Sequence, residues 1–141
     1  PLADRVLRQS SGSQENELIA KGPGGAMKLA RIMRNGGHIG LLVDQKLNEG
    51  IDVPFFGRPA KTAPAIALFA LKYRCPVVPA RVERLGGARF RVTFWPPITL
   101  PDSGDPKADT LALMTDINGW LEEWIRQTPE QWLWLHRRWG K

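Results

Sequence analysis

Residues 38–45 read HIGLLVDQ. Within them, Ile39 to Val43 is a continuous apolar run, bounded by glycine on one side and polar residues on the other. Strands that are buried on both faces have this pattern, as in a parallel sheet. The stretch therefore predicts a buried strand within an α/β layer.

The segments on either side of this stretch agree with that layer. Residues 26–34 place apolar side chains on one stripe and cations opposite, which predicts an amphipathic helix that Asn35-Gly36-Gly37 ends. Residues 44–61 are rich in glycine and proline and predict a long loop. Thr62 is expected to cap a helix over 63–73. Nearer the N-terminus, residues 1–9 have the spacing of a short helix and residues 17–20 that of a short strand.

The second half contains a hairpin pattern and a long helix pattern. Residues 75–83 form a predicted strand, and residues 89–95 alternate strictly between polar and apolar side chains, so the hairpin has one polar face. Asp105-Pro106 is a typical helix start for a segment that runs to about residue 127. Residues 128–131 (TPEQ) match a capping box before a short helix. The expected fold class is α/β, with a mixed, partly parallel sheet flanked by helices.

Composition and charge exclude several classes of protein. The 141 residues are 43% hydrophobic and 24% charged, which is typical of a globular domain rather than a disordered chain. A single cysteine, Cys75, excludes an intrachain disulfide framework. The net charge is +6, and the excess of cations lies in residues 1–100. An anionic partner is therefore expected: nucleic acid, phosphorylated lipid or an acidic carrier protein.

Two segments contain candidate binding residues. Asp44 and Gln45 follow the predicted strand, where open α/β sheets bind ligands, although they also suit a solvated loop start. In the segment 53–62, Phe55 and Phe56 can line an apolar slot while Arg58 and Lys61 meet an anion. The structural alternative for this segment is two core phenylalanines and two solvated cations.

The two histidines give no catalytic pair by spacing. Asp44 follows His38 by six positions, about 20 Å along a strand, so the two side chains cannot meet there. His136 lies in a segment rich in tryptophan and arginine. We expect Trp120 and Trp124 to belong to the core, whereas Trp132, Trp134 and Trp139 are equally compatible with a core and with a membrane-interface belt.

Several blocks, in order, resemble one family. They are GGHIGLLVDQK, GIDVPFFGRPAKT, PVVP and IRQTPEQWLWLHRRW. Together they resemble the lauroyl/myristoyl acyltransferases of lipid A biosynthesis in Gram-negative inner membranes, which are related to the lysophospholipid acyltransferases. The resemblance covers the chain from about residue 22 to residue 139. It implies a glycerolipid-acyltransferase-like fold, of which residues 1–141 are expected to be the C-terminal portion of a single domain.

The resemblance also implies a reaction and its partners. An acyl chain moves from an acyl carrier protein thioester to a hydroxyl of an anionic glucosamine lipid, at the cytoplasmic face of the inner membrane. A His-x-x-x-x-acid pair supplies the base, and no metal or redox cofactor is implied. That pair is absent from these residues, so no catalytic residue is assigned. The positions expected to bind substrate are Asp44, Gln45, Phe55, Phe56, Gly57, Arg58, Thr62, His136, Arg137 and Arg138.

A second class of function fits the charge alone. A non-catalytic basic module could bind anionic lipid or nucleic acid. Arginines alternate with aromatic residues over 89–95, as in some stacking platforms, but the two sets face opposite ways. No nucleic-acid partner is therefore expected.

Overall fold

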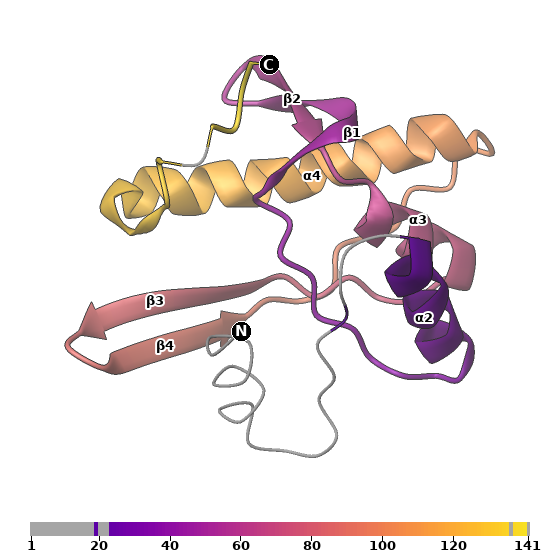
Figure 1. Cartoon of the computed structure of the whole chain (residues 1–141), viewed down its shortest axis with the longest axis horizontal. Helices are drawn as coiled ribbons and strands as arrows, with labels where there is room; N and C mark the ends of the chain where they lie inside the picture. Colours follow the sequence, from indigo (N-terminus) through magenta and orange to yellow (C-terminus); the bar gives the residue numbers. More distant parts are fainter. Residues whose placement is uncertain (1–18, 20–22, 136, 141) are drawn as a thin grey trace. The chain divides into compact units, whose positions relative to one another are not determined.

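The structure is a computed structural model that describes residue 19, residues 23–135 and residues 137–140 (Figure 1). The chain divides into two units, Pro1–Ile39 and Gly40–Lys141. The predicted helix over 1–9 lies outside the described residues, as does the predicted strand over 17–20 except for Ile19.

Helix α2 (Pro23–Arg34) is the described helix of the first unit and confirms the prediction for residues 26–34. It ends where the glycines predict. The N–H groups of Gly36 and Gly37 donate to the carbonyl oxygens of Met33 and Ile32, at 3.1 and 3.0 Å. Gly36 has a φ of 74°, a conformation that glycine adopts without steric cost.

The predicted buried strand over 39–43 is wrong for this structure. These residues have no regular secondary structure, and Leu42 is 84% exposed. A parallel strand needs neighbouring strands that accept and donate its backbone hydrogen bonds. Among the described residues the sheets are two antiparallel pairs, β1–β2 and β3–β4, and neither pairs with this segment. The predicted parallel arrangement is therefore not found, and the fold is mixed α/β.

The predicted loop over 44–61 is wrong as well, because most of it forms an antiparallel hairpin. Strand β1 (Lys46–Phe55) pairs with β2 (Arg58–Thr62). The connecting residues Phe56 and Gly57 have φ values of 51° and 71°. Positive φ at both positions is the geometry of the tightest hairpin turns, and glycine suits it far better than phenylalanine does.

The hairpin contains a bulge at Gly50. Thr62 lies opposite both Lys46 and Ile51, so β1 has extra residues at this place. A Cβ atom on Gly50 would lie 2.3 Å from the carbonyl oxygen of Thr62. Only glycine therefore allows β2 to approach β1 this closely.

Helix α3 (Ala65–Tyr73) begins later than predicted. Thr62 is the last residue of β2, so its expected role as the helix cap is wrong. Pro64 occupies the cap position without a side-chain hydrogen bond. The pyrrolidine ring fixes φ for the first turn, so the helix starts without a hydroxyl cap.

The predicted hairpin and the long helix are confirmed, although the first strand of the hairpin, expected over 75–83, begins only at Ala80 and extends to Gly86. Strand β3 (Ala80–Gly86) pairs with β4 (Arg89–Phe94), and α4 spans Pro106–Gln127. The Asp105 carboxylate accepts hydrogen bonds from the N–H groups of Lys107 and Ala108, as a cap should. The 3₁₀ turn η1 (Pro129–Gln131) follows, but Thr128 makes no side-chain cap there, so the predicted capping box is wrong.

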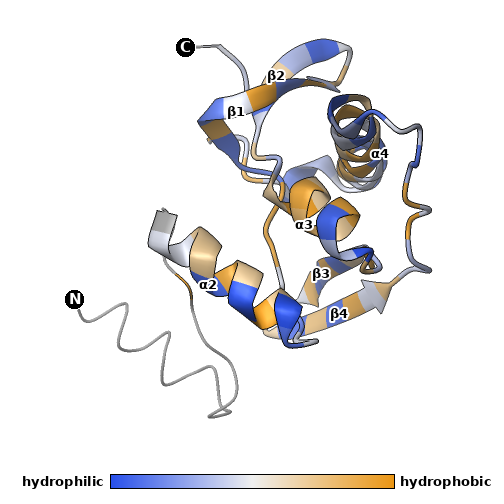
Figure 2. Cartoon of the chain, turned by 90° about the vertical axis from the view of Figure 1, so that its right-hand side faces the viewer, coloured by the Kyte–Doolittle hydropathy of each residue, from blue (hydrophilic) through white to orange (hydrophobic). Residues whose placement is uncertain are grey.

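Helix α4 lies between the two hairpins, as two perpendicular views show (Figures 1 and 2). One core cluster joins it to α3 and β1 through the buried residues Val53, Ala67, Ala70, Val77, Leu113, Met114 and Ile117. A second cluster lies near its C-terminal end, around Phe55, Ala60 and Ile125. Asn118 strengthens the α4–β1 contact by donating to the carbonyl oxygen of Pro54 at 2.9 Å. No helix in the described part of the chain is long and apolar enough to cross a membrane.

Asp109 in the first turn of α4 gives a pH-dependence prediction. Its carboxylate accepts from the Ser103 hydroxyl at 2.7 Å and the Ser103 N–H at 3.0 Å, and these bonds lower the pKa of Asp109. A lowered pKa in the folded state means stability that is present above pH ~4 and lost as the pH falls through the lowered pKa. Asp109→Asn should therefore flatten the loss of stability between about pH 5 and pH 3. Urea titrations across that range test it, with the exposed Asp116→Asn as the control. Equal pH profiles for the two variants would contradict it.

Candidate functional site

The first predicted site residues, Asp44 and Gln45, lie in a bend immediately before β1. Asp44 is half-buried and Gln45 is exposed. The strand that was expected to precede them, over residues 39–43, is absent. Their position is therefore set by β1, which follows them directly. The residue that connects Asp44 to the rest of the site is Arg138, from the other end of the second unit.

Arg138 is the central residue of this region. Its side chain is 1% exposed, and its guanidinium donates to the carbonyl oxygen of Lys61 at 2.8 Å and to Oγ1 of Thr62 at 2.7 Å. It also lies over the ring of Phe55, 5.0 Å from the centroid. Burial lowers the pKa of Arg138, and the negative charge of Asp44 acts in the opposite direction. Among the described residues, the Nε atom of Arg138 has no hydrogen-bond partner.

Thr62 explains why the C-terminal segment docks on β2. The Thr62 hydroxyl is buried, donates to the carbonyl oxygen of Ala60 at 2.9 Å, and accepts from Arg138. Both the hydrogen and a lone pair of this hydroxyl are therefore used. An uncharged partner of this kind orients the guanidinium without neutralising it.

Phe55 is fully buried and lies in an aromatic cluster, so it lines no open slot in this structure. The rings of Phe56, Trp132 and Trp139 have centroids 4.9, 5.8 and 5.4 Å from that of Phe55. The indole of Trp139 also donates to the carbonyl oxygen of Phe55 at 3.2 Å. Of the three tryptophans that the sequence left undecided, Trp132 and Trp139 are packing partners of Phe55, whereas Trp134 is 54% exposed. A pattern in the sequence does not reveal this, because the pairs lie more than seventy positions apart.

The β1–β2 turn presents the other predicted residues. The N–H of Phe56 donates to the Glu122 carboxylate at 2.7 Å, which fixes the strained turn to α4. Gly57 and Arg58 are exposed, and the Arg58 guanidinium lies 5.8 Å from the centroid of the Trp139 ring. The turn is thus held by one carboxylate, and the Arg126 guanidinium lies 4.9 Å from the centroid of the Phe56 ring.

An open depression of about 450 Å³ lies beside these residues. It is lined by Lys46, Asn48, Asp52, Pro59, Lys61 and Gly140. The Lys46 ammonium donates to the carbonyl oxygen of Gly140 at 2.5 Å, and Lys61 forms an ion pair with Asp52 at 2.8 Å. Sequence reasoning did not single out Lys46, Asn48 or Asp52. All three lie on β1, a strand that the glycine- and proline-rich sequence of residues 44–61 does not predict.

Two further predicted residues lie in the C-terminal segment. Arg137 is exposed, and His136 lies outside the described residues. Phe55 and Thr62 contact the guanidinium of Arg138, and the charge of Asp44 acts on it. The four residues come from the end of β1, the end of β2, the C-terminal segment and the bend before β1. Among the described residues, no cluster of three His, Cys, Asp or Glu side chains suits a metal ion.

The comparison with protein families supplies the identity. A model of the bacterial lipid A biosynthesis acyltransferase family matches residues 1–141. The chain belongs to this family. A comparison with curated proteins gives no match. The resemblance on the sequence blocks is thereby confirmed, and lipid A acyltransferase activity is the general function of the family that this chain represents.

For a lipid A acyltransferase family member, the geometry separates two kinds of residue. Phe55, Thr62 and Arg138 are buried and hold the C-terminal segment on the β1–β2 hairpin. Asp44, Gln45, Gly57 and Arg58 are accessible enough to meet a ligand. The individual substrate roles predicted for these residues stay predictions.

Proposed function

We propose that the 141 residues contain part of the substrate-binding region of an enzyme. This enzyme transfers a fatty acyl chain from an acyl carrier protein to a hydroxyl of a lipid A precursor. The family match over residues 1–141 is the observation that carries the proposal. The half-buried Asp44, whose charge acts on the buried Arg138, and the exposed Gln45, Gly57 and Arg58 support it. The enzyme would act at the cytoplasmic face of the inner membrane.

The cations of the site suit an anionic acceptor. Lys46 and Lys61 line the open depression, and Arg58 is exposed at the turn beside it. Ammonium and guanidinium groups bind phosphate through charge-assisted hydrogen bonds, which are about twice as strong as neutral ones. The basic excess of residues 1–100 equally suits an acidic carrier protein as the acyl donor.

The base of the reaction is proposed to lie outside these 141 residues. A hydroxyl is a weak nucleophile near neutral pH, and a positioned base contributes about 10²–10⁴ in rate. The sequence contains His38 and His136, and neither is followed by Asp or Glu at the fifth position. The 141 residues alone are therefore expected to bind substrates without turnover.

Acyl transfer is the direct test. The purified 141-residue chain is incubated with an acyl carrier thioester and a detergent-dispersed lipid A precursor, with and without a family polypeptide that contains the His-x-x-x-x-acid block. We expect turnover only in the mixture. Turnover by the chain alone that His38→Ala or His136→Ala abolishes would place the base within this sequence. No turnover with either arrangement, but salt-sensitive binding to oligonucleotides, would favour the basic module.

Asp44→Asn should lower the turnover of the reconstituted enzyme by about tenfold or more, since one charge-assisted hydrogen bond from the proposed substrate to this carboxylate would contribute about 1.5–3 kcal/mol. The substitution keeps the side-chain size and removes the charge that faces Arg138. Initial rates and urea midpoints are measured together. Asp116→Asn, an exposed change on α4, is the control. Wild-type turnover, or a loss that follows unfolding alone, would show that Asp44 has no role in the reaction.

A further inference from the structure

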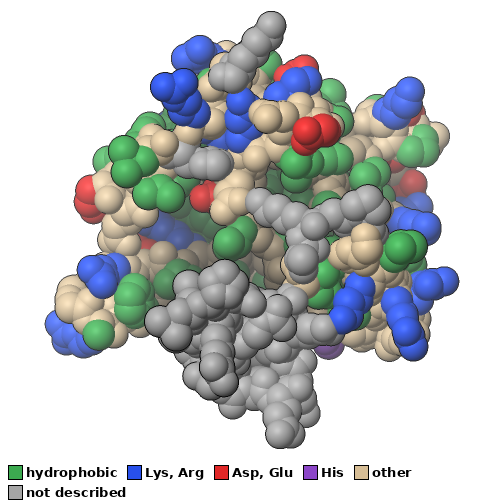
Figure 3. Space-filling model, viewed as in Figure 1, with side chains coloured by type: hydrophobic (Ala, Val, Ile, Leu, Met, Phe, Trp, Pro, Cys, Tyr) green, Lys and Arg blue, Asp and Glu red, His purple; other side chains and the backbone are tan. Residues whose placement is uncertain are grey.

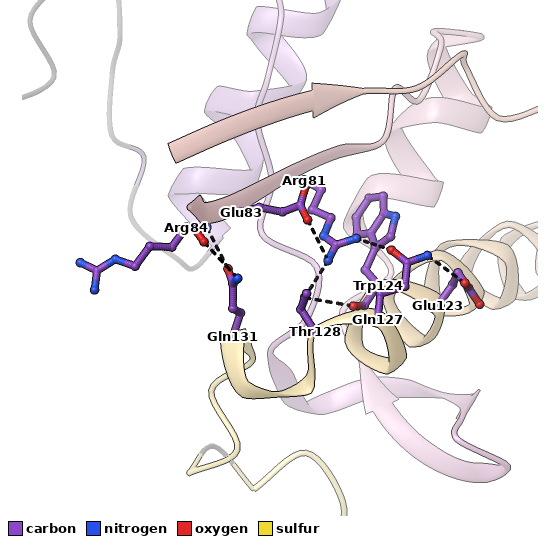
Figure 4. Close-up of polar contacts among 8 residues, drawn as sticks. All are labelled: Arg81, Glu83, Arg84, Glu123, Trp124, Gln127, Thr128 and Gln131. Carbon is purple, nitrogen blue, oxygen red and sulfur yellow. Dashed lines mark hydrogen bonds and ion pairs between the residues drawn. The ribbon is translucent and has the colours of Figure 1, made fainter. Parts of the chain in front are cut away.

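The β3–β4 hairpin turns its polar face toward the rest of its unit. Arg81 on β3 donates to the side chains of Gln127 and Thr128 at 2.6 and 2.7 Å, and it lies 3.3 Å from the Glu83 carboxylate (Figure 4). The side chains of Arg81 and Glu83 are only 10% and 22% exposed. Gln131 in η1 adds bonds to the backbone N–H and carbonyl of Arg84, at 2.8 and 3.2 Å. These contacts fix which face of the hairpin meets α4.

The opposite face is apolar and exposed. Side chains alternate along each strand, so Val82 lies with its partner Val92 between Phe90 and Phe94 on one face. The hydropathy colouring shows hydrophobic and hydrophilic residues following one another along β4 (Figure 2). The exposed fractions of these four side chains are 62%, 53%, 56% and 69%, respectively. A two-stranded ribbon with an uncovered apolar face is marginally stable in water, so a partner is expected to cover it.

The tip of the hairpin extends the apolar surface and adds positive charge. Leu85 is 49% exposed at the turn, which continues through two glycines and Ala88. Arg84 lies opposite Phe90 on the apolar face, with its guanidinium 5.6 Å from the centroid of the Phe90 ring. Arg89 and Arg91 are exposed at the same end of the hairpin, and Arg91 lies on the other face, opposite Glu83. Hydrophobic side chains lie beside Lys and Arg side chains at this end of the molecule (Figure 3, lower left). The one acidic residue between positions 80 and 94 is Glu83, whose charge faces Arg81 on the inner face.

The combination of apolar side chains and arginines on this surface favours a bilayer of anionic lipid as the partner. Aromatic and aliphatic side chains can enter the boundary between headgroups and acyl chains, while arginines bind the phosphates above them. We propose that the β3–β4 hairpin docks this chain on an anionic membrane surface, with the apolar face and tip toward the acyl chains. The inference rests on the proposed function and deepens it, because it names the element that brings a lipid-modifying enzyme to its acceptor.

Vesicle co-sedimentation of the 141-residue chain tests the proposal. The vesicles contain phosphatidylcholine alone or with a quarter phosphatidylglycerol. We expect binding to the anionic vesicles to exceed binding to the neutral ones and to fall with salt, because exposed charges are screened. Phe90→Ser with Phe94→Ser should weaken binding at least about tenfold, and Arg84→Gln with Arg89→Gln about fivefold per arginine at low salt.

Matched controls separate the hairpin from a general change of surface. Leu68→Ser with Leu111→Ser removes two apolar side chains that are 52% and 43% exposed on α3 and α4. Lys72→Gln with Lys107→Gln removes two exposed cations. Both control pairs should bind vesicles like the unchanged chain. Binding of the hairpin variants at the unchanged level would overturn the proposal, and would direct attention to the exposed segment Leu133-Trp134-Leu135.

Two further measurements complete the test. One shows whether a second copy of the chain covers the apolar face, and the other separates a failure of this proposal from a failure of the proposed function. If size-exclusion chromatography shows a dimer that the Phe90/Phe94 variant dissociates, and vesicles do not bind, a second copy covers the face and the proposal is overturned. The acyl-transfer assay on detergent-dispersed acceptor does not need the bilayer. Reduced vesicle binding with normal transfer in detergent supports the hairpin's role. If the vesicles bind, the hairpin variants weaken that binding, and no acyl transfer occurs, the role of the hairpin is still supported. Only the acyltransferase assignment is then rejected.

Discussion

Phe55→Ala is expected to lower the free energy of unfolding by about 3–5 kcal/mol, the range for removing a buried aromatic side chain. Phe55 is 0% exposed and contacts rings from the β1–β2 turn, the residue that follows η1 and the C-terminal segment. No single neighbour can fill the space, because these rings are attached to three separate parts of the chain. The loss should therefore lie near the upper end of that range. Urea denaturation followed by tryptophan fluorescence measures it.

Phe90→Ala is the matched control for this effect. Phe90 is also a strand phenylalanine, but it is 56% exposed, so its loss should change stability by less than about 1 kcal/mol. Similar midpoints for Phe55→Ala and Phe90→Ala would mean that the aromatic cluster does not form. Phe55 would then be available for the apolar slot that its position in the sequence also allows.

The second large effect is expected at Arg138. Arg138→Ala removes the donors that satisfy the carbonyl oxygen of Lys61 and the hydroxyl of Thr62, and it exposes the ring of Phe55. An unsatisfied buried polar group costs about 1–3 kcal/mol, while removing a desolvated charge partly offsets the loss. The net decrease in unfolding free energy should be about 2–3 kcal/mol. Chemical denaturation at neutral pH measures it.

The neighbouring arginine provides the control. Arg137 is exposed, so Arg137→Ala should alter stability by no more than about 0.5 kcal/mol. Arg138→Lys keeps a charge but lacks the planar fork that reaches two acceptors, and its stability should fall between those of Arg138→Ala and the unchanged chain. Equal stability of the Arg137→Ala and Arg138→Ala chains would show that the C-terminal segment does not depend on this guanidinium.

Local signals in the sequence predicted the elements that depend on neighbouring residues. Helix α4 begins at its Asp105-Pro106 cap, α2 ends at its glycines, and the alternation over 89–95 gives the polar and apolar faces of β4. Each of these features is decided within one turn or one strand. They could therefore be predicted without knowing what packs against them.

The errors arose where distant residues decide the structure. Phe56-Gly57 is not a strong hairpin signal, because phenylalanine rarely adopts a positive φ, and the bond to Glu122 on α4 holds it there. Gln131 matched a capping box but bonds to the backbone of Arg84, forty-seven positions away. The apolar run 39–43 has the composition of a strand, but the described residues include no strand that pairs with it.

The candidate site shows the same division. The segments 44–45 and 53–62 were singled out by their position and residue types, and residues 136–138 by the family resemblance; the family is confirmed. The sequence could not show that Arg138 would be buried against Thr62, because that contact joins the end of β2 to the C-terminal segment. The sequence also could not show that the apolar face of the β3–β4 hairpin is turned outward. That orientation depends on the hydrogen bonds that Arg81 donates to Gln127 and Thr128.

The bond of Gln131 to Arg84 has a consequence for solubility. A free strand edge presents unpaired N–H and C=O groups that can recruit a strand of another molecule and begin aggregation. The Gln131 side chain occupies both backbone groups of Arg84, so an incoming strand cannot pair there. Because the face beside that edge is apolar, this single side-chain amide protects the part of the molecule where intermolecular sheet growth would otherwise be most favourable.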